Sequence, residues 1–203
     1  MTLPNHPGVS RETIDKLKCF ESLVRKWTPR INLIAKSTVE HIWDRHIADC
    51  VQLFQYAPSK PKHWLDIGSG GGFPGIVMAI MSQNRGDMAK FTFVESDQRK
   101  ATFLRTAARE LELTVDVRSE RVEEVAGMNA DVITARALKS LDELLPFLHR
   151  HISKNGVAIL PKGQGYAKEI AAVAKHWRFD LKEYPSTTEP AARVLVLKDI
   201  SCD

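Results

Sequence analysis

A glycine-rich turn between two apolar segments carries the clearest chemical signal in the sequence. The turn covers residues 68–75; residues 64–67, which have the pattern of a short buried strand, precede it, and an apolar run, residues 76–81, follows it. Five of its eight residues are glycine. Because glycine lacks a Cβ atom, such a turn can adopt positive φ angles and lets a ligand approach the backbone closely. The pattern predicts a strand, a ligand-binding turn and a helix, in that order.

Part of this turn fits the fingerprint of dinucleotide-binding enzymes. The segment Gly70-x-Gly72-x-x-Gly75 has the required glycine spacing, and Glu95 follows Gly75 by twenty residues, where that fingerprint places an acidic residue. An enzyme that uses a nicotinamide cofactor is therefore one class of protein that the sequence allows.

An overlapping segment favours a different ligand. Asp66 begins the series Asp66-x-Gly68-x-Gly70-x-Gly72, the form that this turn takes in methyltransferases that use S-adenosylmethionine. A carboxylate at the end of the strand would repel a pyrophosphate, whereas it would attract the ammonium and sulfonium groups of S-adenosylmethionine. We therefore favour S-adenosylmethionine over a dinucleotide.

Glu95 is the second acidic residue at the end of a predicted strand, residues 91–95. Its two carboxylate oxygens can accept hydrogen bonds from both ribose hydroxyls of the adenosyl group, which is a binding role rather than acid–base catalysis. Helix capping or plain exposure at a strand end would explain Asp66 or Glu95 taken singly. Two such residues around one glycine turn indicate a cofactor pocket.

Strand and helix patterns alternate from residue 63 onward. Two late segments, residues 179–182 and 193–198, have strand character with no helix between them, and we expect them to pair antiparallel at the edge of the sheet. The alternation predicts an α/β fold with a mostly parallel sheet that binds its ligand at the carboxyl ends of the strands. The other expected strands are near residues 64–67, 91–95, 115–117, 131–135 and 156–160, and the expected helices are near residues 76–81, 97–111, 140–151 and 166–175.

The first sixty residues have a helical pattern instead. Apolar residues recur at spacings of three and four after Ser10, and Pro29 is expected to interrupt that helix. The segment from Ser37 to Glu40 resembles a capping box and predicts the start of a second helix. Two prolines within residues 57–62 mark a linker. We therefore divide the chain into a helical N-terminal extension, residues 1–60, and a cofactor-binding domain, residues 61–203.

The excess positive charge lies in the N-terminal part of the chain. Residues 1–63 contain ten Lys and Arg and six Asp and Glu, a net charge of +4, while the rest of the chain is neutral overall. A basic module beside a neutral one is typical of proteins with a polyanionic partner such as nucleic acid. A lysine-rich solvated helix surface would give the same count, so charge alone leaves both interpretations open.

Apolar runs and cysteine spacing further limit the class of protein. No apolar run is long enough to cross a bilayer, and the first residues lack the apolar stretch of a signal peptide, so we expect a cytoplasmic protein. The three cysteines lie far apart and form no pattern typical of a metal site, so we expect no metal.

The chain as a whole resembles the bacterial small-subunit ribosomal RNA guanine-N7 methyltransferases, the glucose-inhibited division protein B family. The order and spacing of the matching segments carry this resemblance, which covers nearly the whole chain. These segments are Trp27 with Ile31-Asn32-Leu33, Arg45-His46-Ile47-Ala48-Asp49, Gly68–Gly75, Val94-Glu95-Ser96, Lys100-Ala101-x-Phe103-Leu104, Arg121-Val122-Glu123-Glu124, Ala135-Arg136-Ala137 and Pro161-Lys162-Gly163.

The resemblance implies a class I S-adenosylmethionine-dependent methyltransferase, with a Rossmann-like sheet, an antiparallel edge pair and an N-terminal helical extension. It implies methyl transfer to N7 of a guanine in the decoding region of 16S ribosomal RNA, free or in the small ribosomal subunit, by a protein that we expect to be monomeric. By motif position it implies cofactor contacts at Gly68, Phe73, Val122, Glu123 and Arg136. With the residues of the turn and the next strand, the expected cofactor-binding set is Asp66, Gly68, Gly70, Phe73, Glu95, Val122, Glu123 and Arg136.

The implied reaction needs no catalytic base. Guanine N7 carries a lone pair and no proton, so alignment of the two reactants can supply most of the acceleration. The absence of an Asn-Pro-Pro-Tyr segment and of a Pro-Cys pair agrees with a ring-nitrogen acceptor. We expect Arg136, Lys162 and Arg193 to orient phosphates or the guanine O6 edge, although surface solvation would explain Lys162 or Arg193 taken singly.

The helical extension offers candidates for RNA contact in Arg30, Lys36, Arg45 and His46. Contacts of this kind would go mostly to phosphates and weaken with salt. His46 lies on an apolar face, which favours a hydrogen-bonded structural histidine, and Trp27 is expected in the core. A noncatalytic RNA-binding protein, or a methyltransferase acting on a small molecule or a protein, is also open at this point.

Overall fold

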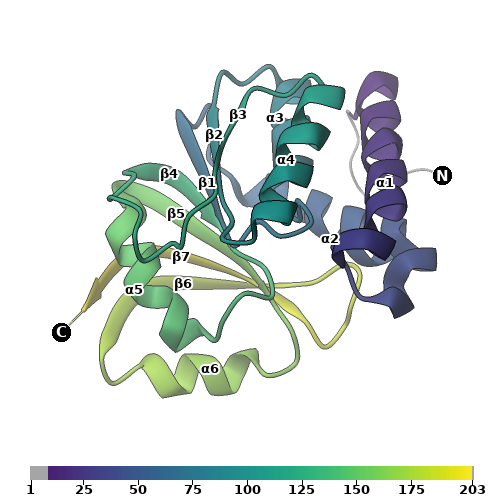
Figure 1. Ribbon diagram of the computed structural model, residues 1–203. Coiled ribbons are helices and arrows are strands. Elements are labelled where there is room, and N and C mark those ends of the chain that lie inside the picture. The colour runs from purple at the N-terminus through teal and green to yellow at the C-terminus, as the bar shows by residue number, and fades with distance from the viewer. Residues whose placement is uncertain (1–8, 203) are drawn as a thin grey trace.

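A single seven-stranded sheet forms the centre of the molecule (Figure 1). The computed structural model describes residues 9–202, and its strand order is β3-β2-β1-β4-β5-β7-β6. The strands are β1 (His63–Ile67), β2 (Lys90–Val94), β3 (Val115–Arg118), β4 (Ala130–Thr134), β5 (Ile152–Lys162), β6 (Trp177–Pro185) and β7 (Arg193–Cys202).

The strand directions confirm the expected edge pair. Strands β3, β2, β1, β4 and β5 pair in parallel, whereas β7 pairs antiparallel with both β5 and β6. Because β7 is inserted between β5 and β6, the order differs from the 3-2-1-4-5-6 order of dinucleotide-binding sheets. This topology counts against the nicotinamide alternative.

Helices cover both faces of the sheet, as the alternating pattern predicts. In Figure 1, α1 (Arg11–Ile31), α3 (Gly75–Arg85) and α4 (Gln98–Glu110) lie on one side of the sheet, and α5 (Leu141–His151) and α6 (Tyr166–Val173) lie on the other. Two clusters of buried apolar side chains match these two layers. Burial on both faces explains why the central strands read as nearly continuous apolar runs.

Two helix starts follow from their capping residues. The Asp97 side chain accepts hydrogen bonds from the backbone N–H groups of Arg99 and Lys100 and begins α4. Ser140 and Glu143 form the expected capping box at the start of α5. Both caps satisfy N–H groups that the first helical turn leaves without partners.

The prediction that Pro29 interrupts the first helix is wrong. Helix α1 runs from the Ser10 cap through Pro29 to Ile31, and Asn32 ends it in the left-handed conformation with its N–H bonded to the carbonyl of Thr28. Proline removes one backbone hydrogen bond, but only half a turn follows it here, so packing of the helix against the sheet layer outweighs that loss.

The second predicted helix is also corrected. Residues 36–56 form a succession of short pieces: the 3₁₀ turn η1 (Lys36–His41), the π turn η2 (Trp43–Ile47), α2 (Ala48–Val51) and the 3₁₀ turn η3 (Gln52–Tyr56). The expected capping box does not form, because Ser37 lies inside η1, whose N-cap is Ala35, and Glu40 pairs with Arg25. Tertiary contacts therefore override the local cap.

The helical extension shares its core with the sheet. Phe20 of α1 lies 5.0 Å from the ring of Phe73 in the glycine turn, and Trp27 packs 5.7 Å from the ring of Phe103 in α4. Trp27 is thus a packing residue, as expected. The apolar cluster on this face runs without a break from α1 to the sheet.

The described residues contain no helix that is both long and apolar enough to cross a membrane. The first eight residues, on which the expectation about a signal peptide partly rests, lie outside the part of the chain that the structure describes.

Candidate active site at the ends of β1, β2 and β4

The glycine turn and the segment after β4 lie beside each other at the point where the strand order reverses. From β1 the chain proceeds outward through β2 and β3, and it then returns to place β4 on the other side of β1. A crevice at such a point, beyond the carboxyl ends of the strands, is where α/β sheets bind ligands. Two cavities lie here, one on each side of residues 136–139.

The first cavity, which we call the Glu95 cavity, has a volume of about 150 Å³. It brings together four of the eight predicted cofactor residues. It is lined by Gly68, Val94, Glu95, Ser96, Glu120, Arg121, Val122, Glu123, Leu138 and Lys139.

Glu95 is held at the entrance of the turn. One carboxylate oxygen accepts a hydrogen bond from the N–H of Gly70 at 2.7 Å, and the other accepts from the N–H of Asp97 at 2.8 Å. The side chain is 8% exposed. Each carboxylate oxygen can accept more than one hydrogen bond, so Glu95 keeps acceptor capacity for a ligand.

Gly70 and Gly72 differ in what their missing side chains would meet. Both have positive φ, +53° at Gly70 and +85° at Gly72. A Cβ at Gly70 would have no atom closer than 3.7 Å, whereas a Cβ at Gly72 would lie 2.7 Å from Ile76 and 3.0 Å from Phe20. Gly70 therefore faces open space where a ligand can approach, and Gly72 permits packing of α1 and α3.

Asp66 lies beneath the turn rather than in the cavity. It is fully buried; the Thr134 hydroxyl donates to Oδ1 at 2.6 Å, and Oδ2 has no hydrogen-bond partner among the described residues. Oδ2 lies against Gly75, where a Cβ would come within 2.7 Å of it. Burial raises the pKa of Asp66 to about 6, although the hydrogen bond from Thr134 opposes that rise.

Phe73 and Arg136 lie away from the Glu95 cavity. The Phe73 ring is 4% exposed and packs between Phe20 and His46. The Arg136 guanidinium lies 5.1 Å from the centre of the Phe73 ring. Both residues therefore join the glycine turn to the helical extension, and their direct contact with a cofactor stays a prediction.

The second cavity, which we call the Arg136 cavity, has a volume of about 380 Å³. It contains the three predicted substrate-orienting residues, together with Arg45 of the extension. It is lined by Arg45, Asp49, Arg136, Ala137, Lys139, Pro161, Lys162, Gly163, Glu169, Ser186, Thr188, Glu189, Ala192, Arg193 and Val194.

Lys162 and Arg193 enter this cavity from adjacent strands. They are register partners on β5 and β7. Lys162 donates to Glu169 at 2.8 Å and to the carbonyl of Lys139 at 3.0 Å, whereas Arg193 donates to the carbonyls of Pro190 and Ala192 and lies over the ring of Tyr166. Neither is simply a solvated surface cation.

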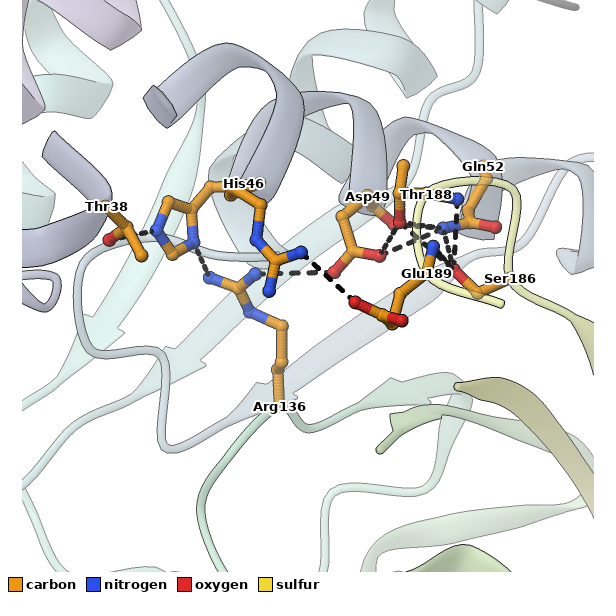
Figure 2. Close-up of polar contacts among 9 residues, drawn as sticks. Thr38, His46, Asp49, Gln52, Arg136, Ser186, Thr188 and Glu189 are labelled. Carbon is orange, nitrogen blue, oxygen red and sulfur yellow. Dashed lines mark hydrogen bonds and ion pairs between the residues drawn. The ribbon is translucent and has the colours of Figure 1, made fainter. Parts of the chain in front are cut away.

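The extension and the loop between β6 and β7 complete this cavity (Figure 2). Asp49 accepts hydrogen bonds from Gln52 and Thr188, and Arg45 pairs with Glu189 at 3.3 Å. Among the other candidates for RNA contact, Arg30 and Lys36 are exposed and line neither cavity, and His46 packs against Phe73 and also lines neither.

Sequence reasoning missed the carboxylates of the second cavity. Asp49, Glu169 and Glu189 come from three distant segments, and no local pattern links them. One available signal was the spacing of His46 and Asp49, because residues three apart on a helical segment lie on the same face.

The sheet topology and the glycine turn together define the class I methyltransferase fold. The SAH-bound methyltransferase PaMTH1 of Podospora anserina superposes with a TM-score of 0.62 at 14% identity, covering 96% of this chain and 90% of that one. The ribosomal protein L11 methylase of Lactobacillus delbrueckii superposes with a TM-score of 0.59 at 19% identity, covering 78% of this chain and 79% of that one.

Sequence comparison gives the family. The model for rRNA small subunit methyltransferase G, also called GidB, matches residues 13–195. Proteins named ribosomal RNA small subunit methyltransferase G from Cereibacter sphaeroides and Ruegeria sp. are 49% and 46% identical to this chain. Each alignment covers 95% of this chain, with 94% of the first relative and 93% of the second. The chain belongs to the rRNA small subunit methyltransferase G family.

Proposed function

We propose that this protein transfers a methyl group from S-adenosylmethionine to N7 of a guanine in the decoding region of 16S ribosomal RNA. The observation that carries the proposal is the pair of cavities on either side of residues 136–139. The Glu95 cavity is suited to an adenosyl group, and the Arg136 cavity is a separate, cation-lined chamber beside it that is suited to a nucleotide.

The residues of the Glu95 cavity fit the cofactor. S-adenosylmethionine, when bound, supplies an activated methyl group on a cationic sulfur. Glu95 would accept the ribose hydroxyls, Val122 would pack on the adenine, and the backbone of Gly70 allows close approach. The orphaned, fully buried Oδ2 of Asp66 places an acidic group beneath the turn, which favours a cationic ligand over a pyrophosphate.

The volumes support a division of the ligand between cavities. About 150 Å³ lies below the 300–1,000 Å³ that whole-ligand pockets usually have. The Glu95 cavity would therefore hold the adenosine end of the cofactor. Lys139 lines both cavities, so the reacting end would lie near the boundary with the Arg136 cavity.

The Arg136 cavity supports a ring-nitrogen acceptor. Guanine N7 needs no base, because its lone pair is free to attack. Asp49 and Glu169 are held by hydrogen bonds and ion pairs from their neighbours. These contacts favour roles as acceptors and ion-pair partners. Lys162 and Arg193 would orient a phosphate or the guanine O6 edge.

The partner in this proposal is 16S ribosomal RNA, free or in the small ribosomal subunit. Arg45, at the rim of the Arg136 cavity, would contact phosphates, and Arg30 and Lys36 would extend that contact along the extension of residues 1–60. An enzyme acting on ribosomal RNA in this way would work in the cytoplasm. We propose that it does so as a monomer and without a metal ion.

Methyl transfer to defined RNA tests the proposal. The protein is incubated with labelled S-adenosylmethionine and either naked 16S ribosomal RNA or small subunits from a strain that lacks the modification. Nucleoside analysis and mapping of the labelled base are expected to give one N7-methylguanine in the decoding region. Label in another base, or no label in either RNA, would overturn the proposal.

A further inference from the structure

The helical extension holds Arg136 from two sides. His46 Nδ1 lies 3.0 Å from one terminal nitrogen of the guanidinium, and the carboxylate of Asp49 lies 3.5 Å from the other (Figure 2). The Arg136 side chain is 17% exposed. Three residues thus connect two segments that lie about ninety positions apart in the chain.

The hydrogen-bond directions around His46 are fixed. An arginine guanidinium has only donors, so His46 Nδ1 must accept and be unprotonated. His46 Nε2 therefore carries the proton and donates to the Thr38 hydroxyl at 2.8 Å, which in turn donates to the carbonyl of Ala35 at 2.8 Å. Burial and the nearby charges of Arg136 and Arg45 lower the pKa of His46 to about 4, so the ring is neutral at neutral pH.

Asp49 connects the same arginine to the outer wall of the cavity. Its Oδ1 accepts from Thr188 at 2.7 Å and from Gln52 at 3.0 Å, while its Oδ2 faces Arg136. Gln52 in turn accepts from the N–H of Thr187 at 2.8 Å. The Asp49 carboxylate therefore contacts both the Arg136 guanidinium and the loop between β6 and β7.

We propose that His46 and Asp49 are positioning residues for methyl transfer, acting through Arg136 in the wall of the Arg136 cavity. The inference rests on the proposed function. A long arginine side chain that is already held in place loses less conformational entropy when the substrates bind. Asp49 also offsets the positive charge of Arg136 beside an acceptor nitrogen that becomes cationic during the reaction.

Two substitutions of His46 separate positioning from packing. His46→Phe keeps a ring against Phe73 but removes both nitrogens, and a lost hydrogen bond to a charged group predicts a fall in kcat of about tenfold. His46→Asn keeps an acceptor near the position of Nδ1 and is expected to recover kcat to within about threefold of the wild type. The matched control is His41→Phe, because His41 is exposed on the same extension and lines neither cavity.

A double-mutant cycle tests whether His46 acts through Arg136. In an Arg136→Ala background, His46→Phe is expected to lower kcat by less than about twofold, and Asp49→Asn likewise. Equal losses in the wild-type and Arg136→Ala backgrounds would overturn the inference. So would failure of His46→Asn to recover more activity than His46→Phe, with both variants folded by circular dichroism.

A measurement on the protein alone keeps this inference separate from the proposed function. Nitrogen-15 NMR of the histidine rings is expected to show His46 protonated at Nε2 and unprotonated at Nδ1. A proton on Nδ1 would overturn the arrangement whether or not the protein methylates RNA. Absence of methyl transfer by the wild-type protein would instead overturn the proposed function.

Discussion

The two cavities take their lining residues from different kinds of segment. The Glu95 cavity comes from turns that directly follow neighbouring parallel strands, and its main hydrogen bonds join Glu95 to the adjacent turn backbone. The Arg136 cavity takes residues from the extension, the segment after β4, the end of β5, helix α6 and the loop between β6 and β7. The fold itself therefore secures the cofactor side, whereas the acceptor side depends on long-range contacts between segments.

The charged residues that line the two cavities also differ. The Glu95 cavity is lined by three carboxylates, Glu95, Glu120 and Glu123, and by two cations, Arg121 and Lys139, and this net negative lining suits a cationic cofactor. The Arg136 cavity includes Arg45, Arg136, Lys139, Lys162 and Arg193 opposite three carboxylates. Two ligands of opposite charge would thus meet near Lys139, which lines both cavities.

The largest expected effect comes from Gly70→Asp. A charged side chain would enter the open space above the turn, so affinity for S-adenosylhomocysteine is expected to fall at least about 100-fold, or about 2.7 kcal/mol. The melting temperature should fall by less than it does for Gly72→Ala, because a Cβ at Gly70 meets no close neighbour and only the positive φ of +53° opposes the substitution. Isothermal titration calorimetry and thermal denaturation measure both quantities.

Gly72→Ala is the matched comparison for that variant. Its Cβ would meet Ile76 and Phe20, so stability is expected to fall by about 1–3 kcal/mol, the range for overpacking. If Gly70→Asp retained cofactor affinity, or if Gly72→Ala left stability unchanged, the division between a ligand-facing and a packing glycine would be wrong.

Asp66→Asn is expected to stabilise the free protein at pH 7.5 by about 1–3 kcal/mol. The pKa of Asp66 is raised from 3.8 to about 6, so its contribution to stability is present below pH 3.8 and lost as the pH rises through 6. Asparagine avoids the buried charge and can still accept from Thr134.

Urea denaturation at pH 5 and pH 7.5 tests the prediction for Asp66→Asn. Its gain in free energy of unfolding over the wild type should be smaller at pH 5, where Asp66 is mostly protonated in the folded wild type. The same variant should bind S-adenosylhomocysteine more weakly, because the acidic group beneath the turn is lost. A variant that is destabilised at both pH values would show that ionised Asp66 supports the turn through contacts rather than straining it.

Glu95→Ala and Arg193→Ala should separate the two cavities. Loss of the Glu95 acceptor is expected to weaken S-adenosylhomocysteine about tenfold and to leave RNA affinity unchanged. Arg193→Ala should do the reverse, weakening RNA binding about tenfold while cofactor affinity stays within about twofold. Binding titrations with each ligand measure this, and equal effects on both ligands would contradict the separation.

The smallest effect is expected for Arg45→Ala. Its exposed pair with Glu189 is worth at most about 1 kcal/mol, so the fold should be unaffected. If Arg45 contacts one phosphate, the slope of log affinity for RNA against log salt should become shallower by about 1. An unchanged slope would mean that Arg45 pairs only with Glu189 in the loop between β6 and β7 and does not contact RNA.

The helical extension is the region where predictions from the sequence were least accurate. Ser10 and the apolar spacing correctly predicted α1, but Pro29 did not end it, because only its last half turn follows the proline. The capping-box pattern at residues 37–40 failed because the turn begins earlier, with Ala35 as its N-cap, and because Glu40 pairs with Arg25. A local pattern cannot report a competing contact from elsewhere in the chain.

The sequence by itself determined the α/β class, the parallel strands with their late antiparallel pair, the glycine turn and the family. These depend on hydrophobic periodicity, glycine spacing and segment order, which are local properties read along the chain. It also placed Asp66 and Glu95 at the ends of neighbouring strands, because parallel strands end at one edge of the sheet.

Only the tertiary structure decided that Asp66 lies buried beneath the turn, that Phe73 faces the extension, and that Arg136 is held by His46 and Asp49. The Arg136 cavity likewise exists only once the loop between β6 and β7 meets the extension. The physical reason is that burial and hydrogen-bond partners depend on packing between segments far apart in sequence, which no local spacing records.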